Sequence, residues 1–236
     1  MPRRQKYKKW GSQCLLILIP LLIVITLMLQ RYNNSLNAYN NLDLSSEFLN
    51  IFRESSDMQM KQSDGPCKVK LSCPEDQFSF FIQSGAANVV PPKVCLQNEL
   101  VLGSALNNAG FGINIVLING KTAEVTKTNH FDMYSGEVKP LIEFLQSIED
   151  GSVVLMVSYD EPSSKLTEEA RKLISELGSS VVHSLSFRDN WVFVGGKGAV
   201  MKSNFEKHIK NDHNNNKYEN WPELIDLQGC IPKYLE

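Results

Sequence analysis

An uncharged apolar run near the N-terminus constrains this chain more than any other feature. Cys14–Leu29 holds 16 residues without a charge, and positions 1–13 contain five basic residues and no acidic one. Sixteen helical residues extend over about 24 Å, and a helix that begins at Trp10 approaches the roughly 20 residues that a bilayer requires. The basic side stays in the cytosol, so we expect everything beyond residue 30 to enter the secretory pathway.

Two interpretations of residues 1–30 remain open. A secretory signal peptide also has a basic start and an apolar centre. Against cleavage, Leu29 is followed by Gln30-Arg31-Tyr32-Asn33, which offers no small-x-small site. For the segment itself we therefore expect an uncleaved anchor, with a cleaved signal peptide as the alternative. The protein is expected to follow the secretory pathway and to be secreted, with retention in the Golgi as a type II membrane protein as the alternative. This segment is the chain's only predicted contact with a membrane.

The charge balance excludes one class of partner. The chain has 24 basic and 26 acidic residues, and five of the basic ones precede the apolar run. The remainder carries a net charge of −7 and offers no basic face for phosphates, which argues against nucleic acid as a partner. Its 42% hydrophobic and 21% charged residues are typical of a globular domain.

Four cysteines lie beyond the apolar run, namely Cys67, Cys73, Cys95 and Cys230. An even number of cysteines in an oxidising compartment predicts two disulfides, and the sequence leaves all three pairings open. Zinc is the competing interpretation, but the chain lacks a C-x2-C pair and a Cys/His cluster, so we predict no metal and no cofactor. Any pairing of Cys230 closes a loop of more than 130 residues.

The part of the chain beyond residue 30 divides into two regions. Residues 31–66 are rich in Asn, Ser, Asp and Gln and are predicted to form a flexible stalk, which carries a glycosylation sequon at Asn33. The globular domain is expected over residues 67–232, a length sufficient for a hydrophobic core.

Apolar periodicity in the domain predicts more strands than helices. Asn119-Gly120 between two β-rich runs predicts a two-residue type I′ hairpin. Ser203-Asn-Phe-Glu206 matches the capping box of a short helix. The antiparallel hairpin favours an α+β fold, and an α/β arrangement of residues 153–194 remains as an alternative. Strands are expected at 78–83, 113–118, 121–126, 153–158 and 191–194, and amphipathic helices at 138–149 and 167–177.

Local sequence patterns give no indication of catalysis. Gly195-Gly196-Lys197-Gly198 lacks the Ser or Thr that a phosphate loop places after its lysine. Ser84-Gly85-Ala86 lacks the flanking glycines of a nucleophile elbow. The four histidines are scattered along the chain. The protein is therefore predicted not to be an enzyme.

Eight strings of the domain are distinctive when they are taken together. In their order and spacing they resemble the small secreted family of interleukin-like epithelial–mesenchymal transition inducer and pancreatic-derived factor, over essentially all of residues 66–232. The same domain type resembles a GG-type lectin module in the stem of a Golgi glycosyltransferase that acts on O-mannosyl glycans. The strings are Ser84–Val90, Asn107-Asn108, Gly112–Asn114, Asn119–Thr122, Phe131–Tyr134, Ser158–Asp160, Phe187–Phe193 and Lys217–Glu223.

The resemblance implies both a fold and a function. The fold is two facing antiparallel sheets with short flanking helices and the disulfides Cys67–Cys95 and Cys73–Cys230. The function is that of a secreted, cytokine- or hormone-like protein that binds a cell-surface receptor, glycosylated or not, without catalysis. One family member carries an additional cysteine, after the position of Trp191, that supports covalent dimers. This chain has Val194 there, so we expect no covalent dimer through that position.

The lectin-like module implies carbohydrate binding as the alternative function. Its acidic residue and one of its arginines match Asp160 and Arg188, an acceptor and a donor for sugar groups. Trp191 is a candidate for stacking on a sugar face. A second arginine of the module falls where this chain has Phe111, so that donor is missing. The competing interpretations are an Arg188–Asp189 ion pair, a turn at Asp160 and core positions for Trp191, Phe131 and Trp221.

Overall fold

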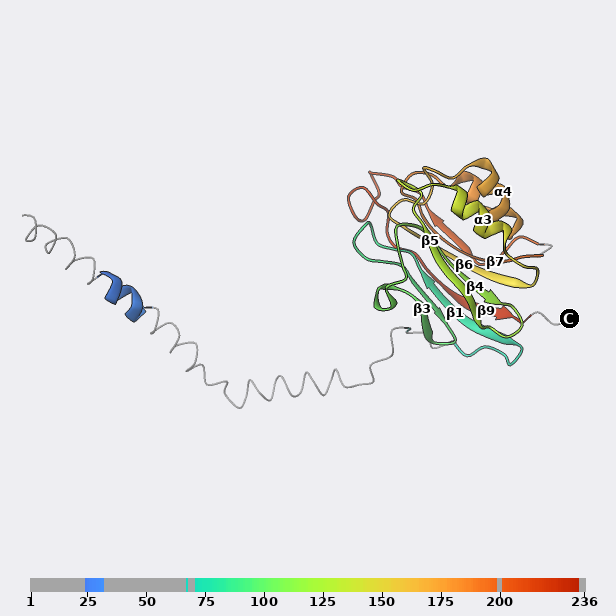
Figure 1. The fold of residues 1–236 in the computed structure, drawn as a ribbon, viewed down its shortest axis with the longest axis horizontal. Helices are drawn as coiled ribbons and strands as arrows, with labels where there is room; N and C mark the ends of the chain where they lie inside the picture. Colours follow the sequence, from blue (N-terminus) through green and yellow to red (C-terminus); the bar gives the residue numbers. More distant parts are fainter. Residues whose placement is uncertain (1–23, 32–66, 68–70, 199–200, 234–236) are drawn as a thin grey trace, which may run out of the picture. The chain divides into compact units, whose positions relative to one another are not determined.

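The structure is a computed structural model that describes residues 24–31, 67, 71–198 and 201–233 (Figure 1). The chain divides between Ser63 and Asp64 into two units, and residues 24–31 of the first are helical. Within the described ranges, none of the helices has both the length and the hydropathy needed to cross a membrane. Most of the predicted anchor lies outside these ranges, as do the sequon at Asn33 and all of the predicted stalk except residue 31.

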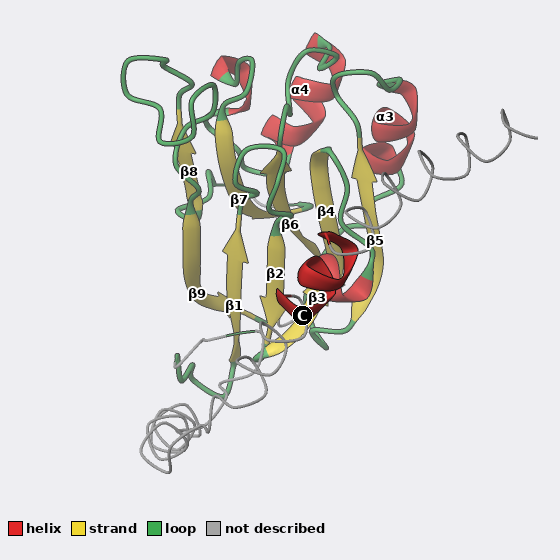
Figure 2. Ribbon diagram, turned by 90° about the vertical axis from the view of Figure 1, so that its left-hand side faces the viewer, coloured by secondary structure: helices red, strands yellow, loops and turns green. Residues whose placement is uncertain are grey.

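The second unit contains two antiparallel sheets, which confirms the predicted α+β fold of two facing sheets. Their strand orders are β3-β2-β1-β9 and β5-β4-β6-β7-β8, and Figure 2 shows the strands of each sheet side by side. The four-stranded sheet consists of β1 (Gln77–Gln83), β2 (Lys93–Leu96), β3 (Glu99–Leu102) and β9 (Asp226–Pro232). The five-stranded sheet consists of β4 (Gly112–Asn119), β5 (Val125–Phe131), β6 (Ser152–Tyr159), β7 (Asn190–Gly196) and β8 (Glu206–Ile209).

Two short α-helices cover one face of the five-stranded sheet, and the four-stranded sheet lies on its other side (Figure 1). They are α3 (Lys139–Gln146) and α4 (Glu168–Glu176), and both were expected from their amphipathic patterns. The hydroxyl of Thr167 accepts a hydrogen bond from the Ala170 N–H and caps α4. The 3-10 turns η1 (Ser104–Leu106) and η2 (Val182–Ser184) complete the described helical structure of this unit.

The five-stranded sheet is buried on both faces. In β6, Val154 and Met156 face the helices, whereas Val153, Leu155 and Val157 face the other sheet. This alternation follows from the two-residue period of a strand. It explains why β6 is apolar along almost its whole length although its neighbours are antiparallel.

The disulfides pair Cys67 with Cys95 and Cys73 with Cys230, as the family resemblance implied. The first joins the start of the domain to β2, and the second fastens β9. Val194 is 3% exposed and packs in the core between the sheets.

The predicted turn between β4 and β5 is wrong in its detail. The two strands do form an antiparallel pair, but β5 begins at Val125, and the register shifts next to Ile118. The Asn119 side chain accepts hydrogen bonds from the N–H groups of Lys121 and Thr122, which extends the loop beyond two residues. β5 is an exposed edge strand, so its side chains do not fix the register by burial.

Two further sequence-based expectations are also wrong. The segment 203–206 opens no helix, because Glu206 begins β8. Its carboxylate instead accepts hydrogen bonds from the Ser180 N–H at 2.7 Å and the Trp191 indole at 2.9 Å. In addition, β6 and β7 pair antiparallel, so residues 153–194 do not form the parallel unit of an α/β fold.

Candidate functional site

Asp160 lies directly after β6, where the chain leaves the five-stranded sheet. Its backbone is left-handed, with φ of 61°, a conformation that non-glycine residues rarely adopt. One carboxylate oxygen, Oδ1, accepts a hydrogen bond from the indole N–H of Trp221 at 3.0 Å. Among the described residues, the other oxygen accepts no hydrogen bond, and the side chain is partly exposed. Asp160 therefore combines a fixed orientation with a free acceptor.

Arg188 lies before β7, at the same end of the sheet, and its backbone is also left-handed, with φ of 57°. Its guanidinium carbon is 4.0 Å from the centre of the Trp221 ring and 4.9 Å from that of Phe187. Nε is buried and has no hydrogen-bond partner among the described residues. Asp160 and Arg188 thus meet on Trp221, one at its edge and the other over its face.

Asp189 fixes the turn that carries Arg188. Its carboxylate is 2% exposed and accepts hydrogen bonds from the Ser186 N–H at 2.8 Å and the Asn211 N–H at 2.7 Å. His208 Nε2 on β8 lies 2.7 Å from the same carboxylate. The alternative of an Arg188–Asp189 ion pair is therefore incorrect, because Asp189 bonds away from its neighbour. These contacts stabilise the left-handed backbone of Arg188, a conformation that is unfavourable by itself.

Low pH is expected to weaken the hydrogen bonds of the Asp189 carboxylate and so to destabilise the fold. Burial would raise the pKa of Asp189, but hydrogen bonds from His208, Asn211 and Ser186 outweigh it and hold the pKa below its ordinary value of 3.8. Folding therefore favours the ionised form, and its contribution is present above about pH 4 and is lost as the pH falls through the folded pKa.

Urea denaturation between pH 7 and pH 3 measures this contribution. Asp189→Asn is expected to lower stability at pH 7 by about 2–4 kcal/mol, because a buried charged acceptor is lost, and to flatten the decline below pH 4. An unchanged pH dependence in the variant would show that other carboxylates cause the decline.

Trp221 was predicted to be a core residue, and the structure corrects this. It is only partly buried, and it lies in the segment 210–225 between β8 and β9. Trp221 forms an isolated bridge with Tyr218. Asn216 helps to order the segment by accepting from the Asp212 N–H and donating to the Glu219 carbonyl. The asparagines of this segment therefore stabilise its turns through their side-chain amides.

Trp191, in contrast, does not reach the surface. It is 0% exposed, stacks on Phe193 with ring centres 5.7 Å apart, and belongs to the core between the sheet and the helices. An indole without an exposed face cannot stack on a ligand in this conformation. The structure thus corrects the proposed role of Trp191, and it places Phe131 in the same core.

Phe111 extends the site along the end of the sheet. It is 46% exposed and packs on Tyr159, with ring centres 4.9 Å apart. The backbone on either side approaches other atoms so closely that only glycine fits, since a Cβ on Gly110 would clash with the His130 ring and one on Gly112 with the Phe131 carbonyl oxygen. The strand pairing of Gly112 with Tyr159 explains why residues 111 and 160 share this end.

Tyr159 links Phe111 to Asp160. Its pKa is raised by burial and by the Asp160 charge, so the phenol stays protonated and donates to the Asn88 carbonyl at 3.0 Å. On the other side of Arg188, Phe187 and Tyr134 contact each other and are 43% and 62% exposed. We call this set of residues at one end of the five-stranded sheet the Arg188 surface; it consists of Phe111, Tyr134, Asp160, Phe187, Arg188 and Trp221.

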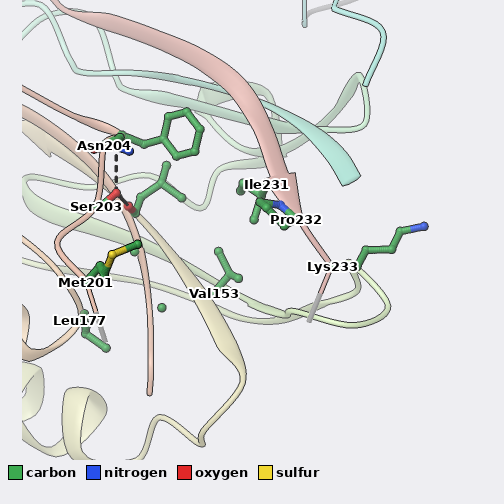
Figure 3. A pocket seen from close by; sticks show the side chains of 12 residues that line it. Val153, Leu177, Met201, Ser203, Asn204, Ile231, Pro232 and Lys233 are labelled. Atoms are coloured by element: carbon green, nitrogen blue, oxygen red, sulfur yellow. Dashed lines mark hydrogen bonds between the residues drawn. The ribbon is translucent and has the colours of Figure 1, made fainter. Parts of the chain in front are cut away.

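A separate pocket lies between β9 and the β7–β8 connection, with a volume of about 310 Å³. Val153, Met201 and Ile231 lie around it (Figure 3). Its lining is mainly apolar, so it offers little that would orient a polar ligand. His, Cys, Asp and Glu side chains form no group suited to a metal ion within the described part of the chain.

The fold defines a class: a disulfide-bonded domain of two antiparallel sheets, here with the Arg188 surface at one end of the five-stranded sheet. Comparison with known proteins makes the assignment specific. A family model described as Interleukin-like EMT inducer matches residues 111–199. The chain belongs to this family, the FAM3 family, which confirms the resemblance seen in the sequence motifs.

Three relatives show the extent of the similarity. Protein FAM3C of Rattus norvegicus is 52% identical over 190 residues, which cover 80% of this chain and 84% of the relative. Protein FAM3C of Danio rerio is 57% identical over 166 residues, which cover 70% and 73%. Protein FAM3A of Homo sapiens is 47% identical over 167 residues, which cover 71% and 73%.

Proposed function

We propose that this protein is a secreted, cytokine-like signalling protein that binds a cell-surface receptor through the Arg188 surface and catalyses no reaction. Family membership and the two disulfides support a place in the secretory pathway. Release from the cell rather than retention in the Golgi would be detected by mass spectrometry of the N-terminus of the secreted form.

One observation carries the proposal. Phe187, which is 43% exposed, lies against Arg188, and Tyr134, which is 62% exposed, lies against Phe187; the described residues provide no carboxylate within 4.0 Å of Arg188. Aromatic residues and arginine are enriched at the centres of protein interfaces and supply most of the binding energy there. Large exposed aromatic groups reduce solubility, so a surface of this kind is best explained by a partner.

Substitution of this surface is expected to weaken binding to responsive cells. Phe187→Ala and Arg188→Ala should each lower affinity about 30-fold, the effect typical of a residue at the centre of an interface. Labelled full-length protein in a saturation assay measures the change. Met201→Ala is the matched control, because Met201 is 81% exposed and is not part of the Arg188 surface.

Stability must be measured in parallel. Arg188→Gly gives a second test, since glycine relieves the left-handed backbone while it removes the guanidinium. This variant should keep its melting temperature and lose binding. Full binding by all three surface variants would locate the receptor contact elsewhere.

Carbohydrate binding is the second candidate function. It is favoured by the free carboxylate oxygen of Asp160 beside a guanidinium that donates no hydrogen bond to the described residues. A sugar presents both hydroxyl donors and oxygen acceptors and can satisfy both groups at once. The two proposals are compatible, because a receptor can be recognised through its glycans.

A glycan array tests the second candidate. The full-length protein is compared with Arg188→Ala, which should lose binding, and with Phe111→Arg, which restores a donor and should strengthen it. Binding by Phe111→Arg alone would mean that the original site is inactive in this chain. If none of the three proteins binds a glycan on the array, a protein receptor remains as the target.

A further inference from the structure

We propose that the ligand of the Arg188 surface carries a carboxylate, and that it is an acidic sugar of the sialic or uronic acid type on a receptor glycan. This inference rests on the carbohydrate-binding function proposed above and specifies its ligand class. It follows from the environment of Arg188, which the structure leaves without a counter-ion.

Arg188 is a cation that the described part of the protein does not neutralise. It forms no ion pair within 4.0 Å there, and its guanidinium donates no hydrogen bond to any of those residues. Nε is enclosed, so water does not compensate it at that position. A charge held in this way is unfavourable by itself and gains most from an anionic partner.

The geometry selects a carboxylate among the possible anionic groups. Because Trp221 and Phe187 lie against the guanidinium and Nε is enclosed, the two terminal nitrogens are the groups that a ligand can meet. Together they form a planar fork that matches the two oxygens of a carboxylate. Aromatic contacts also order the side chain before binding, which reduces the entropy lost on association.

Asp160 favours a sugar over an acidic peptide side chain. Its free oxygen needs a donor close to the anion, and an acidic sugar carries hydroxyl groups beside its carboxylate. The same aspartate, together with the net charge of −7 beyond residue 13, disfavours highly sulfated polymers.

The test compares three probes that differ only at the terminal sialic acid. They are a sialylated N-acetyllactosamine glycan, its desialylated form and the methyl ester of the sialylated form, each titrated into full-length protein by calorimetry. The sialylated glycan should bind at least about tenfold more tightly than either neutral probe, and the difference should shrink as salt is raised. Arg188→Gln should remove the preference, and Arg188→Lys should restore part of it.

Asp160→Asn is the matched discriminating variant. Asparagine still accepts from the Trp221 indole but no longer repels an anion, so the ratio of acidic to neutral affinity should rise. Equal binding of all three probes would overturn the acidic ligand and leave carbohydrate binding intact. If none of the three probes binds, the result would count against both the acidic ligand and the carbohydrate-binding function. An acidic peptide that binds as tightly as the sialylated glycan would overturn the assignment to a sugar.

Discussion

Loss of the Cys73–Cys230 disulfide is expected to lower the free energy of unfolding by about 4–5 kcal/mol. The bond joins cysteines 157 residues apart, so its removal releases a long loop in the unfolded chain. In the folded state, β9 is an edge strand that, among the described strands, pairs with β1 alone, and of its own side chains only Ile231 is fully buried. The strand therefore depends on the disulfide for its position.

The Cys73→Ser/Cys230→Ser variant tests this by urea denaturation. Cys67→Ser/Cys95→Ser is the comparison, because these cysteines are 28 residues apart and the same entropy argument gives about 3–4 kcal/mol. The second variant is thus expected to be the more stable of the two. The reverse order would mean that native contacts near Cys67, not chain entropy, determine the contribution.

Trp191→Ala is expected to lower the free energy of unfolding by about 3–5 kcal/mol, the usual result of emptying a large core site. The side chain is 0% exposed, and its removal would also leave the Glu206 carboxylate without one of its donors. Trp191→Phe keeps most of the volume and should reduce stability by about 1–2 kcal/mol.

A binding assay distinguishes a purely structural role of Trp191 from a direct contact with the ligand. Because Trp191 lies in the core, Trp191→Phe should bind cells and glycans as the unchanged protein does, at a temperature where both remain folded. A loss of binding without a loss of stability would show that Trp191 contacts the ligand after a rearrangement.

The sheets could be predicted from the sequence because their signal is local and periodic. β6 is a continuous apolar run, and both helices show an amphipathic stripe that ends at a glycine. The segment at Glu206 shows the limit of such patterns. The four residues 203–206 are compatible with either a helix cap or an extended segment. The extended form is found because the Glu206 carboxylate accepts hydrogen bonds from Ser180 and Trp191, which are distant in sequence.

The candidate site was only partly predictable. Asp160 and Arg188 were identified by resemblance, whereas Trp221, which joins them, was assigned to the core. Its hydrogen-bond partner is 61 residues away, and no local pattern reports that contact. Trp191 was expected at the site because it is close to Arg188 in sequence, but the strand alternation directs it toward the helices.

The two glycines around Phe111 have an evolutionary consequence. Because they have no Cβ, they let the backbone approach the His130 ring and the Phe131 carbonyl closely, and this requirement does not depend on the side chain of the residue between them. Residue 111 can therefore change from a cationic to an aromatic side chain without any adjustment of the sheets beneath. Relatives can in this way diverge in what they recognise while their architecture stays the same, so ligand preference should not be transferred from one member to another on overall identity alone.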